Sequence, residues 1–371
     1  MLTFRQRRLN LSREVRNVPC RGGTPWGGTA HHECGIFARE KCQSGPRRHA
    51  TSIIFCAERR KLTSQYQDDR RNSSTRLTFV TVVLIWAAPA GAQELGNKVL
   101  GTLGLLAGSQ PGSGLYVADR FLRYSSNELI DRNGHRIPVG LDLDAVANAV
   151  GVQVTFPLLR HSIYMNASVG VPAARISLQT DRPEASIDRY GFGDLYVQPL
   201  KIGWKTSRID IVAGYSFYAP TGRFTPRTSD GVGRGYWTHQ FSLGSAVYFD
   251  RAKTWHISEL ASYDLNQRKQ GIDLTRGDTV QVQGGTGKTL GIVDVGLAGY
   301  ALWQVRDDRG NALPEALRGA RDRAFGLGPE VDITLAPIRS RITLRYCHDI
   351  AVKARPLGQI MLIGLTVLAR R

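Results

Sequence analysis

Long apolar runs and cysteines are scarce in this chain of 371 residues. After residue 92 the longest apolar run is Ile360–Ala369, and its ten residues are about half of the roughly 20 that a membrane-spanning helix needs. Four of the five cysteines lie before residue 57, so that only Cys347 remains in the later part. These absences exclude a bundle of membrane-spanning helices and an intramolecular disulfide after residue 92.

Motifs for metal, nucleotide or hydrolytic chemistry are incomplete. The histidines after residue 92 form no i, i+4 pair and there is no C-x-x-C, so the sequence predicts no metal site. Gly284–Thr289 resembles the end of a phosphate-binding loop, but Val282 stands where that loop needs a glycine. Ser242 and His239 fall on opposite faces of one predicted strand. We therefore predict no cofactor and no catalytic residues, with an outer-membrane lipid hydrolase as the rival from another class.

Positive charge is in excess but is not concentrated. The formal net charge is +18; residues 1–69 contribute +7, from 13 basic and 6 acidic residues. Residues 93–371 contribute only +8, from 33 basic and 25 acidic residues that are scattered over predicted turns and loops. Because no basic stripe or stacking motif is present, the sequence does not favour a nucleic-acid partner.

An export signal is predicted at residues 70–92. Arg70, Arg71 and Arg76 precede an uncharged run, and the small residues of 90–92 close it, which predicts cleavage after Ala92. Residues 1–69 show no sustained periodicity, and we interpret them as an unstructured extension from a mis-assigned start. A long export extension and a metal module are the alternatives.

Twelve strand-like segments follow, and their connections alternate between long and short. The predicted strands are 114–125, 142–158, 162–178, 191–206, 208–221, 236–250, 254–268, 278–289, 292–307, 322–337, 340–353 and 358–369. Most loops after odd strands are long, whereas every turn after an even strand is short. This pattern is typical of an antiparallel up-and-down barrel whose two ends lie at the short-turn rim.

Strand length separates a membrane barrel from a soluble sandwich. Apolar and polar residues alternate in both, but these segments run for about 12 to 18 residues, where strands of soluble proteins average about five or six. The fold class is therefore all-β: a transmembrane antiparallel barrel of about 12 strands over residues 114–371. Residues 93–113 are expected to form a short helix or linker that lies at the rim or plugs the lumen.

The polar set of each alternating strand is expected to face the lumen. The candidate lumen-lining residues are Asp194, Asp210, Gln240, Asp264, Gln281, Asp294, Gln304, Glu330, Arg341 and Arg345. At Pro199 the apolar register switches from odd to even positions, which predicts a β-bulge, because proline cannot donate to a strand ladder.

Three motifs carry a family resemblance. Gly191–Trp204 contains a Gly-Asp-Leu…Pro-Leu…Gly-Trp pattern, and Gly214–Gly222 and Gly326–Glu330 follow it. Together they resemble the outer-membrane protein family associated with the meta-pathway of phenol degradation. The resemblance covers about residues 114–371, and the final aromatic with which many outer-membrane barrels end is replaced by Arg371.

The resemblance implies a bacterial outer-membrane pore that admits small hydrophobic or aromatic compounds by passive diffusion. Its partners would be outer-membrane lipid and that solute. A hydrophobic pore is expected to hold an apolar pocket, which we place under residues 222–235. A general porin and a structural outer-membrane protein are the alternatives, and the sequence does not indicate an oligomeric state.

Overall fold

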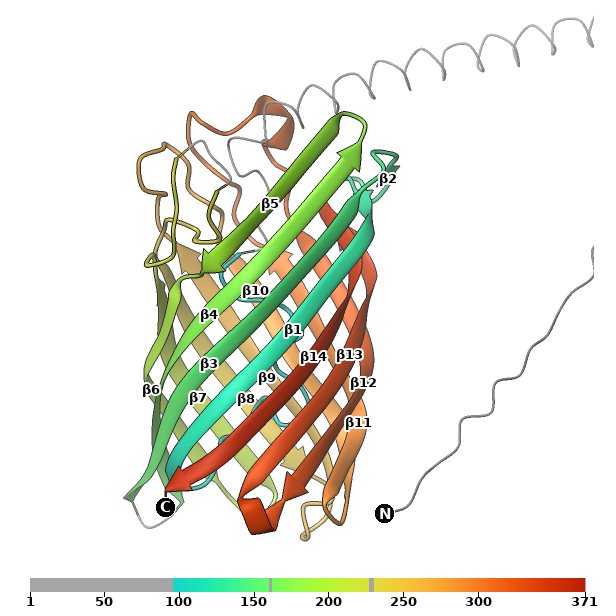
Figure 1. Cartoon of the computed structure of the whole chain (residues 1–371). Coiled ribbons are helices and arrows are strands. Elements are labelled where there is room, and N and C mark those ends of the chain that lie inside the picture. Colours follow the sequence, from blue (N-terminus) through green and yellow to red (C-terminus); the bar gives the residue numbers. More distant parts are fainter. Residues whose placement is uncertain (1–95, 160–161, 227–229, 371) are drawn as a thin grey trace, which may run out of the picture. The chain divides into compact units, whose positions relative to one another are not determined.

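The computed structural model describes residues 96–159, 162–226 and 230–370 (Figure 1). The predicted signal peptide, its cleavage site and residues 1–69 lie outside these ranges. The strands are β1 (Gly114–Ile130), β2 (Arg136–Ile137), β3 (Asp142–Leu159), β4 (Ile163–Asp181), β5 (Glu184–Phe192), β6 (Leu195–Lys205), β7 (Ile209–Ala219), β8 (Thr238–Tyr248), β9 (Trp255–Asn266), β10 (Thr279–Leu290), β11 (Val293–Gln304), β12 (Arg323–Leu335), β13 (Ser340–Lys353) and β14 (Arg355–Arg370). The two short 3-10 helices are η2 (Glu315–Leu317) and η3 (Ala336–Ile338).

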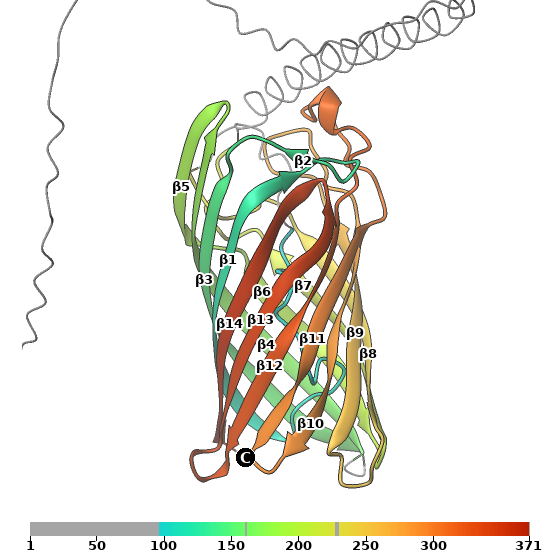
Figure 2. The ribbon, with the colours of Figure 1, turned by 90° about the vertical axis from the view of Figure 1, so that its right-hand side faces the viewer.

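Twelve of these strands close into an antiparallel barrel, which confirms the predicted fold class. Each barrel strand pairs with its neighbour in sequence, and β14 pairs with β1 to complete the ring (Figures 1 and 2). The other two are additions: β2 pairs with the end of β1, and β5 pairs with β4. No helix in the described ranges is long and apolar enough to span a membrane.

Short turns join the strands at the rim where β14 ends, and most connections at the opposite rim are longer (Figure 1). We call these the short-turn end and the long-loop end. In the β8–β9 turn, the backbone N–H groups of Trp255 and Thr254 donate to Asp250, and these bonds hold the pKa of that carboxyl below its ordinary value. A carboxylate that accepts such bonds fixes the turn at neutral pH.

The outer wall is apolar, as expected for a barrel in lipid. On β3, Val150, Val152 and Val154 are about 40–50% exposed, and on β8 Phe241 and Leu243 are 54% and 62% exposed. Side chains on the opposite face of the same strands point into the lumen, because successive residues of a strand alternate. Phe241 is therefore not buried between two sheets, and the sandwich alternative is wrong.

A bulge interrupts β6 at Gln198 and Pro199. Val197 pairs with Phe217 and Leu200 pairs with Tyr215, so two residues of β6 face one of β7. The extra residue shifts the register, and Leu200 and Ile202 then continue the exposed apolar face. The bulge predicted at Pro199 is confirmed.

Two sequence predictions are wrong. Residues 179–190, predicted as a loop, belong largely to the β4–β5 hairpin, which extends beyond the barrel rim (Figure 1). Residues 96–113 contain turns and no helix, so the helical alternative for that segment fails. They run inside the barrel (Figures 1 and 2), which agrees with the alternative that this segment plugs the lumen, and we call residues 96–113 the plug segment.

The plug segment runs along the lumen from one end to the other. At the long-loop end Asn97 donates to Thr238 at the start of β8. At the short-turn end Ser109 donates to Asp210 and Gln110 donates to the carbonyl of Tyr164. The first described residues therefore lie at the long-loop end, and only the start of β1 and the end of β14 share the short-turn rim. The prediction that the two ends of the barrel lie at the short-turn rim is therefore confirmed for β1 and β14.

Candidate functional site: the plug segment and a luminal cavity

A buried ion pair fixes the middle of the plug segment. Glu330 on β12 and Arg345 on β13 form two hydrogen bonds of 2.7 Å, and their exposed fractions are 2% and 6%. The same two side chains bind the plug segment: Arg345 donates to the carbonyl of Gly101, and the N–H of Leu105 donates to Glu330. The pair thus orders the backbone of the plug segment, whose N–H and C=O groups have no neighbouring strand to form hydrogen bonds with.

Glycines in the barrel wall make room for Leu105, whose side chain is fully buried. A Cβ added at Gly285, Gly287 or Gly296 would lie 2.8–3.2 Å from the Leu105 methyl groups. The Gly284–Thr289 motif is part of strand β10, and its Gly285 and Gly287, with Gly296 of β11, form a seat for the plug segment. The absence of side chains here is a packing requirement.

The ten predicted lumen residues form several separate groups. Nine of them are at most 7% exposed, and Arg341 is partly exposed. Gln240 and Gln281 both donate to Asp264, and this network lies beside Leu103, whose N–H donates to the neighbouring Gln283. Since these residues are engaged with one another or with the plug segment, their role in lining a conducting path stays a prediction.

The remaining members of the set lie nearer the two rims. Arg341 pairs with Asp332 at 2.7 Å and lies 3.7 Å from Asp294. Asp210 accepts from Ser109, Tyr248 and Lys253. Gln304 binds Asp308 and the N–H of Asp322 at the long-loop end. No group of three or more potential metal ligands occurs among the described residues.

Asp194 fastens a long loop to the barrel. Its two carboxylate oxygens accept the N–H groups of Gly222 and Arg234, near the two ends of the loop between β7 and β8. Asp194 belongs to the Gly-Asp-Leu motif, and its buried position explains why that position holds an acceptor. The sequence could not assign this role, because the partners are 28 and 40 residues away.

We expect Asp194→Ala to loosen this loop without unfolding the barrel. Two N–H groups lose their acceptor, at a cost of about 1–3 kcal/mol each where they stay buried. Trypsin should then cut faster at Arg223 or Arg234 in the folded protein. Asp194→Asn, which keeps one carbonyl acceptor, should give an intermediate rate. Equal protection in all three proteins would refute the role.

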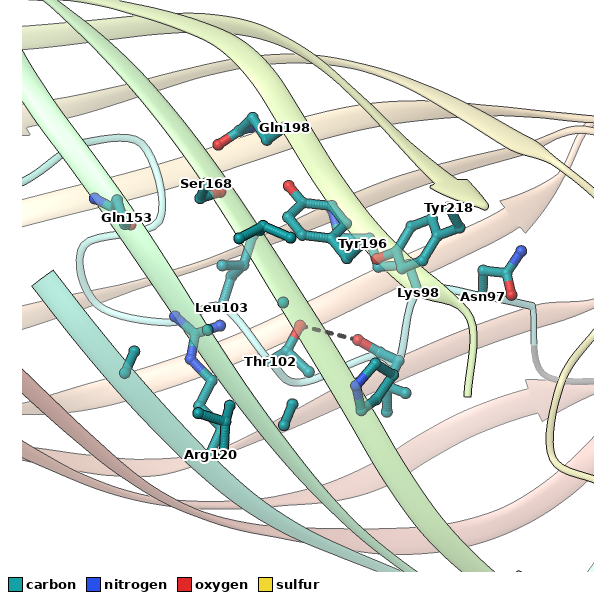
Figure 3. A pocket seen from close by; sticks show the side chains of 18 of the residues that line it. Asn97, Lys98, Thr102, Leu103, Arg120, Gln153, Ser168, Tyr196, Gln198 and Tyr218 are labelled. Carbon is teal, nitrogen blue, oxygen red and sulfur yellow. Dashed lines mark hydrogen bonds between the residues drawn. The ribbon is translucent and has the colours of Figure 1, made fainter. Parts of the chain in front are cut away.

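A cavity of about 340 Å³ lies beside the plug segment, against β1, β3, β4 and β6–β8 (Figure 3). Space remains there because the luminal positions of β3 and β4 carry small residues: Gly151 pairs with Gly170, and Ala147 and Ala149 precede them. Leu103 of the plug segment and Leu122 of β1 add apolar surface. Gln240 is the one predicted lumen residue in its lining.

The cavity differs from our expectations in its position and its chemistry. No described residue of 222–235 lines it, so the predicted location under that loop is wrong. Arg120, Tyr196 and Tyr218 line it and were missed. Alternation along β1 would have placed Arg120 in the lumen. Lys201 also lines the cavity and was missed, although the register switch predicted at Pro199 places it on the luminal face of β6.

Ser242 and His239 do not form a nucleophile–base pair. Ser242 lines the cavity and donates to the carbonyl of Gly214, whereas His239 lies on the opposite face of β8. There the two ring nitrogens of His239 contact the Tyr215 hydroxyl and the Gln267 amide. A hydrolase needs the two groups within hydrogen-bond reach of each other, which this arrangement prevents.

The fold and the occupied lumen define a class, the twelve-stranded barrel of the outer-membrane type with a segment inside it. The COG4313 outer membrane channel from Pseudomonas putida F1 is similar, with a TM-score of 0.63 and 11% identity over 73% of this chain and 99% of that chain. The chain belongs to the family described as "Putative MetA-pathway of phenol degradation", whose profile matches residues 126–361.

Two other solved barrels are less similar in structure. The beta domain of the Bordetella autotransporter BrkA has a TM-score of 0.42 and 11% identity over 69% of this chain and 100% of that chain. The CymD monoaromatic hydrocarbon channel has a TM-score of 0.34 and 8% identity over 71% of this chain and 90% of that chain. Among curated proteins, none matches this sequence.

Proposed function

We propose that this protein is a passive outer-membrane channel for small hydrophobic or aromatic compounds. Its long-loop end would face the exterior, and it would be exported by a signal peptide cleaved after Ala92. The observation that carries the proposal is a lumen whose long axis holds the plug segment and whose side holds a separate cavity. Membership of a family connected with phenol degradation supports the same solute class.

The cavity suits one small ring compound. Its volume of about 340 Å³ exceeds the roughly 150 Å³ of an apolar cavity known to accept benzene. It falls at the lower end of the range of about 300–1,000 Å³ for ligand pockets. Its wall combines aliphatic side chains with Tyr196 and Tyr218, whose ring centroids are 5.1 Å apart. A hydrated sugar would gain little from such a wall, whereas an aromatic ring would lose apolar surface to it.

The deciding experiment is paired uptake of a phenol and a hydrophilic sugar in cells with and without the gene. We expect deletion to slow phenol uptake at low concentration and to leave sugar uptake unchanged. A general porin would give the reverse result. If the protein hydrolyses lipid and a single serine substitution abolishes that activity, the protein is an enzyme and the proposed channel function is wrong.

A further inference from the structure

The cavity contains positive charge without a matching acid. Lys98, Arg120 and Lys201 line it, and none of its described lining residues is Asp or Glu. The carboxylates of Asp264 and Glu330 act electrostatically on Lys98 and Arg120. Both acids are engaged elsewhere, Asp264 with Gln240 and Gln281 and Glu330 with Arg345.

Two of the three cations have no direct partner. Lys98 donates to Ser262 at 3.0 Å, but neither Arg120 nor Lys201 makes a side-chain hydrogen bond or ion pair with another described residue. Arg120 is exposed to the cavity, and Figure 3 shows its side chain extending into it. The contrast with the fully paired Arg345 is informative, because cations inside a membrane protein are usually paired unless they serve a ligand or an ion.

An aromatic wall stands beside these cations. Tyr196 and Tyr218 come from neighbouring strands, and their rings are inclined at 52° to each other. Figure 3 places them across the cavity from Arg120, with Leu103 of the plug segment between. The site therefore offers a planar cation donor at one side and ring surfaces at the other.

We propose that this cavity binds aromatic carboxylates, molecules with one ring and one anionic carboxyl group. The inference rests on the proposed channel function and narrows its solute class. The carboxylate accepts two hydrogen bonds from the Arg120 guanidinium and is stabilised by Lys201, while the ring packs against Tyr196 and Tyr218. A neutral phenol or alcohol leaves both cations without a counter-charge, and an aliphatic acid such as acetate leaves the aromatic wall uncovered.

The test compares benzoate, benzyl alcohol and acetate on the full-length processed protein in detergent micelles, by isothermal titration calorimetry. We expect benzoate to bind more tightly than either of the others. Arg120→Gln should weaken benzoate binding by about tenfold, the size of one solvent-screened charged hydrogen bond, and leave benzyl alcohol unchanged. Arg120→Lys, which keeps the charge but loses the planar fork, should fall between the two.

Arg123→Gln is the matched control. Arg123 lies three residues along the same strand but on the outer face, where it pairs with Asp144 at 2.8 Å. Removing it should not change benzoate binding. Heat-dependent migration in gels reports whether each variant is folded, and Lys201→Gln supplies a second lumen variant should Arg120→Gln fail to fold.

Three outcomes would overturn the inference. Benzoate could bind no more tightly than benzyl alcohol, acetate could equal benzoate, or Arg120→Gln and Arg123→Gln could have equal effects. Failure of the channel function is distinguishable, because gene deletion would then leave the uptake of both aromatic compounds unchanged. If aromatic uptake requires the gene while benzoate binding ignores Arg120, only the inference fails.

Discussion

Arg345→Ala is expected to destabilise the folded barrel by about 3–5 kcal/mol, the cost of leaving one partner of a buried ion pair alone. Glu330 would remain 2% exposed in the wild-type geometry and would lose both hydrogen bonds from Arg345. The carbonyl of Gly101 would also lose its donor. Urea-dependent folding into phospholipid vesicles measures the free energy of unfolding.

Arg123→Ala provides the comparison for an exposed pair. Its partnership with Asp144 is solvent-accessible, so we expect at most about 1 kcal/mol. A double variant, Glu330→Gln with Arg345→Met, should lose less than the sum of the single changes, because no charge is then left alone. A loss below about 1 kcal/mol for Arg345→Ala would show that water or a rearranged plug segment replaces the pair.

The second large effect is on conductance. Deleting Gly96–Gln110, while keeping the residues before them, should raise single-channel conductance several-fold in planar bilayers. The segment occupies the lumen between the Glu330–Arg345 pair and the glycine seat on β10 and β11. Its removal leaves a barrel of twelve strands with an aqueous interior, and small sugars should then pass.

Leu105→Ala tests the same point with a smaller change. Loss of a fully buried leucine costs about 2–5 kcal/mol, most of which should weaken docking of the plug segment and produce brief openings. Leu106→Ala is the matched control, because its side chain is only partly buried. Unchanged conductance in both the deletion and Leu105→Ala would show that the plug segment does not obstruct the path.

The barrel was predictable because its signal is local and repeated. In β11, Val295 and Leu297 alternate with Asp294 and Gly296, and the strand lies between a short turn at Gly291 and the long loop of residues 305–322. Twelve such segments with alternating connections admit few other arrangements. The β4–β5 hairpin was missed because its residues lie beyond the rim, where no lipid enforces alternation.

The plug segment was misread for a physical reason. Leu95, Val99, Leu103 and Leu106 have helix-like spacing, but hydrogen bonds to Glu330 and Ser258 and from Arg345 replace those that a helix would make internally. Those partners lie more than 140 residues away in the sequence, so no local sequence pattern could predict these hydrogen bonds. The cavity was missed for the same reason, since it exists only where the plug segment leaves the small residues of β3 and β4 uncovered.

The path of the plug segment also constrains how the molecule can be assembled. Its last residue, Ser113, is joined directly to β1, and β1 forms the closing seam with β14, the last strand to be made. We therefore expect the plug segment to lie within the curling sheet before β1 and β14 pair, so that packing of the interior and closure of the wall occur in one cooperative step. A variant with a weakened seat, such as Leu105→Ala, should accordingly insert more slowly as well as conduct more.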